Sequence, residues 1–225
     1  MYERELSLIS EEQLAKIKHI RIVIIGVGGV GGAALEMLVR LGFHNITIID
    51  NDQVSLSNLN RQILYNQTNL KQPKVLAAKE HCLKINPQIN IKPLPVFLTE
   101  ENIHSYLRED YDYLIDACDT ITTKLAIIKI CLEQNIKFIT AMGSGNRFDP
   151  STLSIKDFWQ ITNDPVAKAL RPLLRKNNLK QSFMAVASSE LPIKITNRTP
   201  GSIALVPNTA GILCAYYIFN DIIKE

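Results

Sequence analysis

The fold of this chain is decided by residues 21–32, Arg-Ile-Val-Ile-Ile-Gly-Val-Gly-Gly-Val-Gly-Gly. The apolar, β-branched run after Arg21 predicts a buried strand that stops at Gly26. The glycines permit a tight turn and let the backbone approach a phosphate group, which then binds at the N-terminus of the next helix. We predict that helix over residues 29–41. The pattern therefore indicates a strand, loop and helix that bind a nucleotide, with Gly26, Gly28, Gly29 and Gly31 at the phosphates.

A second predicted strand, residues 45–49, ends at Asp50. An acidic residue at this point in a βαβ unit accepts hydrogen bonds from ribose hydroxyls. The alternative is that the glycines serve only close packing of helix against strand, but the order of strand, loop, helix, strand and acid favours a nucleotide site. Both NAD and ATP fit these features.

Polar and cationic residues follow the second strand, and they favour ATP. Asn58, Arg61, Gln62 and Lys74 lie where a dehydrogenase needs no cations, whereas cleavage of a triphosphate builds charge on the departing pyrophosphate. Asp119 follows another predicted strand, and a carboxylate at that sheet edge is a candidate Mg²⁺ ligand. Taken singly, Arg61 and Lys74 are equally compatible with solvated charges, and Asp119 with an N-cap of the next helix.

The rest of the chain alternates strands with helices, which predicts an α/β, Rossmann-like, doubly wound and mostly parallel sheet. We expect one domain in three parts: a nucleotide-binding part at 1–142, a substrate-binding part at 143–200, and a closing strand and helix at 201–225. The further predicted strands are 89–96, 111–116, 137–141 and 202–206, and the further helices are 10–18, 74–85, 100–108, 121–134, 165–176 and 208–223.

Positive charge is concentrated in one segment. The chain carries a net charge of +3, but residues 151–200 hold eight Lys and Arg against three Asp and Glu. Three of these cations, Lys168, Arg171 and Arg175, fall at i, i+3 and i+7 of a predicted helix, with Lys176 beside them. Such a cluster can neutralise the phosphates of a nucleic acid, although a solvated helix face has the same pattern.

The cysteines and the N-terminus indicate a cytoplasmic protein. Cys82, Cys118, Cys131 and Cys214 form no C-x-x-C pair, which argues against a zinc ribbon and suits a reducing compartment. The first residues are charged, unlike a signal peptide, and no apolar run approaches the ~18 residues of a membrane helix, so we expect no membrane contact. Cys118 is either an acyl acceptor or a small buried hydrophobic residue.

Residues 21–119 resemble the adenylating superfamily of ubiquitin-activating enzymes and their bacterial relatives that activate sulfur-carrier proteins. The resemblance implies that Asp50 binds ribose and that Asn58, Arg61, Gln62 and Lys74 bind the ATP phosphates. It further implies that Asp119 binds Mg²⁺. Arg4 resembles the family's arginine finger, which the partner subunit of a homodimer contributes to the γ-phosphate. Sulfur-relay proteins remain open as partners.

Residues 141–166, 188–190 and 200–202 resemble one subgroup, the tRNA threonylcarbamoyladenosine dehydratases. The resemblance implies ATP-dependent cyclisation of a threonylcarbamoyl side chain on an adenosine next to the anticodon, through an acyl-adenylate and attack within the same side chain. The absence of C-x-x-C pairs agrees with a reaction that needs neither zinc nor a thioester. The alternative is a zinc-free adenylyltransferase for a sulfur-carrier or ubiquitin-like protein. A dehydrogenase explains only the glycine loop and Asp50.

Overall fold

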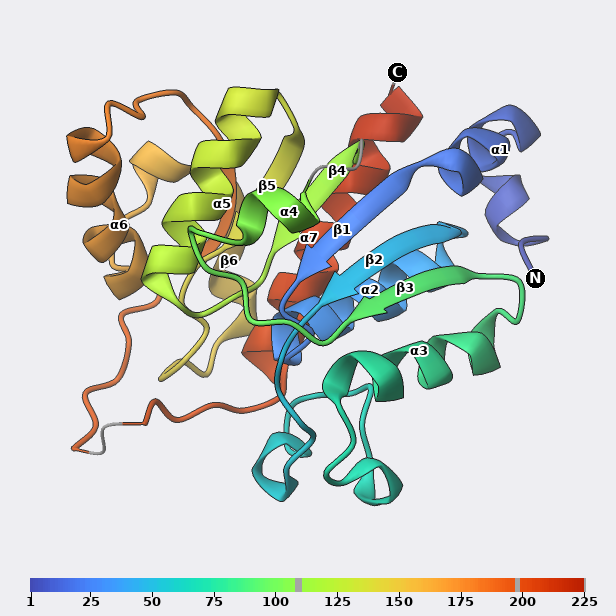
Figure 1. Ribbon diagram of the computed structural model, residues 1–225, viewed down its shortest axis with the longest axis horizontal. Coiled ribbons are helices and arrows are strands. Elements are labelled where there is room, and N and C mark those ends of the chain that lie inside the picture. Colours follow the sequence, from blue (N-terminus) through green and yellow to red (C-terminus); the bar gives the residue numbers. More distant parts are fainter. Residues whose placement is uncertain (108–110, 197–198, 225) are drawn as a thin grey trace.

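The computed structural model describes residues 1–107, 111–196 and 199–224, and these form a seven-stranded sheet flanked by helices (Figure 1). The strand order is β3-β2-β1-β4-β5-β7-β6, and every neighbouring pair is parallel except β6 with β7. The strands are β1 (Arg21–Ile25), β2 (Asn45–Ile49), β3 (Asn90–Leu94), β4 (Tyr113–Asp116), β5 (Lys137–Ala141), β6 (Leu153–Asp157) and β7 (Met184–Ser188). The helices are α1 (Glu11–His19), α2 (Gly29–Arg40), α3 (Lys74–Ile85), α4 (Ile103–Tyr106), α5 (Ile121–Gln134), α6 (Pro165–Lys176) and α7 (Leu205–Lys224).

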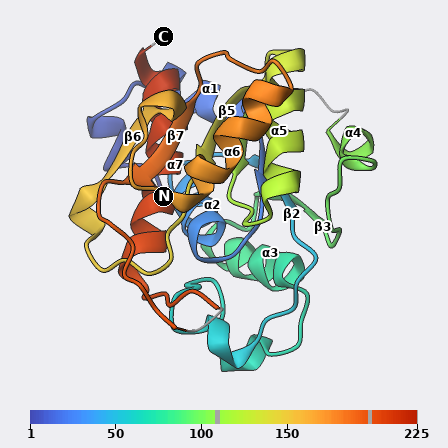
Figure 2. The ribbon, with the colours of Figure 1, turned by 90° about the vertical axis from the view of Figure 1, so that its left-hand side faces the viewer.

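A separate hydrophobic core lies on each face of the sheet. Alternate residues of β1, such as Ile22 and Ile24, pack with side chains of α1, α2, α3 and α7. The intervening residues, Val23 and Ile25, pack with side chains of α4, α5 and α6 on the other face. Figures 1 and 2 show the two layers of helices with the sheet between them. Burial of both faces explains why the inner strands read as continuous apolar runs. Of the helices described, none combines the length and apolar character needed to cross a membrane.

The structure confirms most predicted elements and corrects two of them. The predicted strand 202–206 is wrong, because α7 already begins at Leu205. Pro207 lies in the first turn of α7, where a proline costs little, since an N–H there has no partner within the helix. The predicted helix 100–108 is reduced to the single turn of α4, and its expected end at Arg108 lies outside the described residues.

Strands β6 and β7 were not predicted from the sequence. β6 is an edge strand in which Leu153 and Ile155 alternate with polar residues and pack against one core, but this pattern is too short to mark a strand by itself. β7 consists largely of small residues, Met-Ala-Val-Ala-Ser, and carries little β-propensity of its own. Pairing with β5 creates these strands, and β6 then turns back antiparallel to β7.

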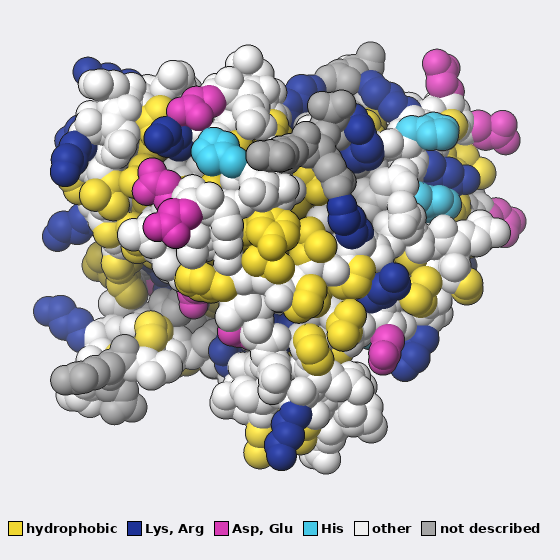
Figure 3. Space-filling model, in the orientation of Figure 1, with side chains coloured by type: hydrophobic (Ala, Val, Ile, Leu, Met, Phe, Trp, Pro, Cys, Tyr) yellow, Lys and Arg dark blue, Asp and Glu magenta, His cyan; other side chains and the backbone are white. Residues whose placement is uncertain are grey.

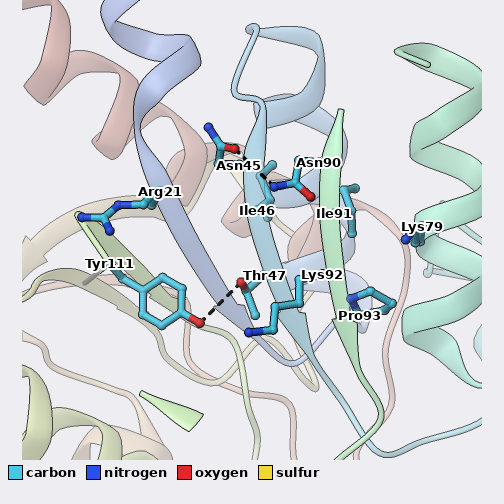
Figure 4. A pocket seen from close by; sticks show the side chains of 10 residues that line it. All are labelled: Arg21, Asn45, Ile46, Thr47, Lys79, Asn90, Ile91, Lys92, Pro93 and Tyr111. Atoms are coloured by element: carbon cyan, nitrogen blue, oxygen red, sulfur yellow. Dashed lines mark hydrogen bonds between the residues drawn. The ribbon is translucent and has the colours of Figure 1, made fainter. Parts of the chain in front are cut away.

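The amino-terminal half of β1, β2 and β3 borders a hollow, to which Tyr111 and Lys79 of α3 also contribute. The volume of this hollow is about 420 Å³ (Figure 4). Tyr111 donates to Thr47 across it at 3.4 Å, and the amide of Asn90 donates to that of Asn45 at 3.4 Å. Figure 3 shows apolar side chains gathered over the centre of this side of the molecule. The hollow lies at the edge of the sheet opposite the glycine loop.

Candidate nucleotide-binding and active site

The candidate site lies where the strand order reverses. The chain leaves β1 toward β2 and β3 and then returns to β4 on the other side of β1. Ile25 is level with Ile49 of β2 and with Asp116 of β4, so the loops that follow these strands meet at one edge. In open α/β sheets this crevice is the usual place for a ligand.

The glycine loop is shaped by the loop that follows β4. Gly26 has φ +87°, and a Cβ there would lie 2.7 Å from the carbonyl oxygen of Ala117. A Cβ at Gly31 would lie 1.8 Å from the carbonyl oxygen of Gly26. At Gly28, by contrast, a Cβ would meet only the Gln62 side chain, at an ordinary 3.6 Å. Packing within the protein therefore requires Gly26 and Gly31, whereas the space at Gly28 suits close approach of a phosphate to the N-terminus of α2.

Asp50 holds the glycine loop against the end of β2. Its carboxylate accepts the backbone N–H groups of Val27 and Asp52, each at 2.8 Å. Asp52 in turn pairs with Lys74 at 2.7 Å. The Lys74 side chain is 6% exposed and that of Asp52 is 60% exposed. The structure thus places Asp50 and Lys74 at the same sheet edge, and it adds Asp52, which sequence reasoning missed although it follows Asp50 by two residues.

The segment 58–62 lies beside the glycine loop. Gln62 is buried next to Gly28, and its Oε1 has no hydrogen-bond partner among the residues that the structure describes. Arg61 is half-buried and donates to the carbonyl of Ser57 at 2.8 Å. The Asn58 amide oxygen accepts from the backbone N–H of Ser55 at 3.1 Å, so it also stabilises this turn. A buried, unpartnered amide at the loop fits a site that acquires polar partners when a nucleotide binds.

Hydrogen bonds join the segment 58–62 to the start of α7 and to the residues just before it. The Asn208 amide donates to the carbonyl oxygen of Arg61 at 3.0 Å. The Asn60 amide donates to that of Ser202 at 2.9 Å. Residues about 140 positions apart in the chain therefore share one wall of the site. Sequence reasoning missed Asn208, and the only available signal was its position in the first turn of the closing helix.

Asp119 lies exposed on the loop after β4. The N-cap of α5 is Thr120, which makes no side-chain capping bond, so Asp119 is not the cap of this helix. Its Oδ1 accepts the Thr120 hydroxyl at 3.4 Å. No group of three or more His, Cys, Asp or Glu that could hold a metal is found within the described part of the chain. A Mg²⁺ ion bound here would take its remaining ligands from phosphates and water, which is usual for this ion.

Cys118, next to Asp119, is not activated as a nucleophile. Burial and then the charge of Asp116 raise the pKa of its thiol far above its usual value. A thiol with a raised pKa stays protonated at neutral pH and reacts slowly. Burial also raises the pKa of Cys82 and of Cys214 to about 12, and that of Cys131 further.

A buried ion pair supports the loops after β4 and β5. Lys124 of α5 donates to Asp116 at 2.7 Å, to the hydroxyl of Thr140 at 3.1 Å and to the carbonyl of Ala141 at 3.0 Å. Burial by itself lowers the pKa of Lys124, but the attraction of Asp116 outweighs it and raises this pKa overall. The second carboxylate oxygen of Asp116, Oδ1, accepts the backbone N–H of Cys118 at 3.2 Å. The pair was not predicted, because Lys124 lies within an otherwise ordinary helical pattern.

A second buried pair organises residues 143–190. Arg147 and Asp164 are both fully buried and lie 3.0 Å apart. The Arg147 guanidinium also donates to the carbonyl oxygens of Ser188 and Glu190, and the Asp164 carboxylate accepts the backbone N–H of Gly143 at 3.1 Å. Asp164 also caps α6 through the N–H of Ala167. The pair ties the ends of β5 and β7 to the start of α6.

The other residues predicted for the site, Arg4 and the cations of α6, lie away from the sheet edge that carries the glycine loop. Arg4 is exposed near the amino ends of the strands, where Tyr2 packs against Gly42 just before β2. Lys168, Arg175 and Lys176 are exposed on α6, whereas Arg171 is half-buried. Arg171 donates to the carbonyl of Ile161 and lies over the Phe158 ring at 5.6 Å. The structure therefore separates Arg171, which packs, from the cations that face solvent.

Known proteins resemble the chain over its whole length. It is 34% identical to the tRNA threonylcarbamoyladenosine dehydratase of Bacillus subtilis, covering 100% of this chain and 95% of that protein. The crystal structure of the Escherichia coli tRNA N6-threonylcarbamoyladenosine dehydratase with ATP superimposes with a TM-score of 0.93 at 29% identity, covering 99% and 93% of the two chains. The molybdopterin-synthase adenylyltransferase of Haemophilus influenzae is 32% identical, covering 79% and 72%. The ThiF family model matches residues 2–215, and the chain belongs to the ThiF family.

Proposed function

We propose that the protein is an ATP-dependent tRNA threonylcarbamoyladenosine dehydratase. The observation that carries the proposal is the match to the Bacillus subtilis dehydratase over the entire chain, which includes the part beyond the nucleotide site. The Escherichia coli dehydratase has been crystallised with ATP and with AMP, the substrate and a product of an adenylation reaction. The open space at Gly28, the N-terminus of α2 and the unpartnered amide oxygen of Gln62 support a nucleotide site in this chain.

The reaction proceeds in two steps. The threonine carboxylate of the modified adenosine attacks the α-phosphate of ATP, and pyrophosphate leaves. A nucleophile within the same side chain then attacks the activated carbonyl, the ring closes, and AMP leaves. Because both reacting groups belong to one side chain, their effective concentration is already high, and no covalent enzyme intermediate is required.

Each residue at the sheet edge has a role in this scheme. Asp50 accepts from the ribose, and the N–H groups of the glycine loop bind the phosphates. Asn58, Arg61, Gln62 and Lys74 surround the pyrophosphate, and the two cations stabilise its developing charge. Mg²⁺, held by Asp119, supplies further charge when bound. Residues 143–200 form the substrate-binding part, in which the exposed cations of α6 contact tRNA phosphates. We place the enzyme in the cytoplasm, with its substrate.

Cys118→Ala is expected to retain cyclisation within about threefold, since its protonated, half-buried thiol takes no part in the reaction. The measurement is single-turnover conversion of modified tRNA, with thermal unfolding recorded alongside to detect packing loss. A variant that keeps its melting temperature and forms the adenylate, but never closes the ring, would establish a covalent intermediate instead.

We also propose a homodimer in which Arg4 acts on the partner's ATP, because it lies far from the glycine loop of its own chain. Arg4→Ala and Asp119→Asn should each be inactive alone. After the two variants are mixed and allowed to exchange subunits, half of the dimers are mixed, each with one intact site, so activity should return to about a quarter of wild type. No recovery, with subunit exchange verified by mass spectrometry, would show that Arg4 acts within its own chain or not at all.

The test of the function is exchange of labelled pyrophosphate into ATP. Exchange should appear with tRNA that carries threonylcarbamoyladenosine, and not with unmodified tRNA. Exchange that instead depends on a sulfur-carrier protein with a free C-terminus would favour the adenylyltransferase alternative, to which the Haemophilus influenzae relative belongs.

A further inference from the structure

A recess of about 460 Å³ lies at the far end of α6 and is lined by Trp159, Arg175 and Lys180. Trp159 belongs to a short 3-10 helix, Phe158–Gln160, that follows β6, and Lys180 lies on the return from α6 to β7. Figure 2 shows α6 on the outside of the molecule. The recess has no role in the adenylation chemistry described above.

The aromatic floor of the recess is held rigidly. The indole N–H of Trp159 donates to the carbonyl of Gln181 at 3.1 Å, and its backbone N–H donates to Asp157 at 2.7 Å. Phe158 meets the Trp159 ring edge-on at 5.3 Å and stacks on Phe183 at 4.8 Å. The indole plane is therefore fixed by hydrogen bonds on one side and by packing on the other.

Two cations border this floor. The Arg175 guanidinium lies 5.7 Å from the Trp159 ring centroid, and Lys180 is exposed beside it. The nearby acid, Asp157, is engaged by the Trp159 N–H and by the Ser182 hydroxyl. A flat aromatic ring, a flat cation and a point charge thus share one recess.

This combination matches one unpaired nucleotide. A base stacks on an aromatic ring or a guanidinium plane, and its phosphate pairs with an ammonium group. Duplex RNA keeps its bases stacked internally and would contact only the cations. A free phosphate or an acidic peptide would likewise pair with the cations without stacking on the Trp159 ring.

We propose that this recess binds an unpaired nucleotide of the RNA substrate; the inference rests on the proposed function for the identity of that RNA. Asp164 fixes the start of α6 to Gly143 at the active edge, and Arg175 lies 11 residues further along the helix, roughly 16 Å away at 1.5 Å per residue. The recess is therefore a second anchor for the RNA, distinct from the reacting nucleotide.

The experiment uses Trp159, the single tryptophan of the chain, as its reporter. Titration with a short single-stranded oligoadenylate should quench its fluorescence to saturation, whereas an RNA duplex of equal charge and inorganic phosphate should not. Arg175→Gln and Lys180→Gln should each weaken oligoadenylate binding about tenfold. The matched control Lys84→Gln, an exposed cation of α3 that does not line the recess, should change it less than twofold.

A second set of variants tests the ring itself with labelled RNA hairpins. Trp159→Leu should weaken binding of the hairpin loop about tenfold, and Trp159→Phe should restore most of it, with both melting temperatures recorded. Equal quenching by duplex and single strand, or hairpin binding by a folded Trp159→Leu that matches wild type, would overturn the inference. If the wild-type protein shows no tRNA-dependent pyrophosphate exchange, the proposed function is wrong. The exchange assay therefore tests the proposed function, whereas the fluorescence and hairpin-binding assays test the recess.

Discussion

Asp119→Asn is expected to lower tRNA-dependent adenylation at least 100-fold while the fold stays intact. Asp119 is exposed and is not the cap of α5, so the change removes no packing and no helix cap. What it removes is the proposed Mg²⁺ ligand and, with it, several kcal/mol of stabilisation of the departing pyrophosphate. The measurement is labelled pyrophosphate exchange at saturating ATP.

The control for this variant is Glu133→Gln, which removes an exposed carboxylate at the other end of α5 and should leave exchange unchanged. The melting temperature of Asp119→Asn should lie within about 2 °C of wild type, as for other surface substitutions. Normal turnover by the variant would show that Asp119 does not bind the metal, and unfolding would give it a structural role.

Lys124→Met is expected to destabilise the protein by about 3–5 kcal/mol, because it leaves the Asp116 carboxylate buried without its counter-charge. Thr140 and the carbonyl of Ala141 lose a donor at the same time. The measurement is the free energy of unfolding from urea denaturation. Lys129→Met, on the same helix at a position whose side chain is only partly buried, should change that free energy by less than about 0.5 kcal/mol.

The double variant Asp116→Asn/Lys124→Met separates charge from packing. It removes both charges while Asn keeps an acceptor for the N–H of Cys118, so it should recover about 2 kcal/mol or more. A double variant as unstable as Lys124→Met would mean that the packing of the Lys124 stem carries the effect.

The pH dependence of this pair has a defined direction. The pKa of Lys124 is raised in the folded state, so its contribution to stability is complete below the pKa of an unfolded lysine. The contribution is lost as the pH rises through the folded pKa. The difference in stability between wild type and Lys124→Met should therefore hold at neutral pH and shrink in strongly alkaline solution.

The sequence alone determined the elements whose information is local. The strand at 21–25, the helix after the glycine loop and the helix predicted over 10–18 appear in the structure within one residue of their predicted positions. Buried parallel strands and amphipathic helices can be predicted from sequence, since their apolar periodicity depends on neighbouring residues only. The position of Asp50 and Asp119 at one sheet edge also followed, because parallel strands bring their carboxyl ends together, whereas Lys74 begins α3 and pairs with Asp52 after β2.

Tertiary structure decided what depends on partners distant in the chain. β7 forms because β5 offers an edge to pair with, and β6 forms because β7 offers the next edge, whereas the strand patterns of these two segments are short or weak. The helical spacing of Lys168, Arg171 and Arg175 predicted one cationic face. In the structure, Arg171 instead donates to the carbonyl of Ile161 and packs on the Phe158 ring. Arg175 packs on the Trp159 ring. The pairs Asp116–Lys124 and Arg147–Asp164 are equally long-range. Burial and charge pairing are properties of the assembled fold, so local periodicity does not reveal which cations pack internally and which face a ligand.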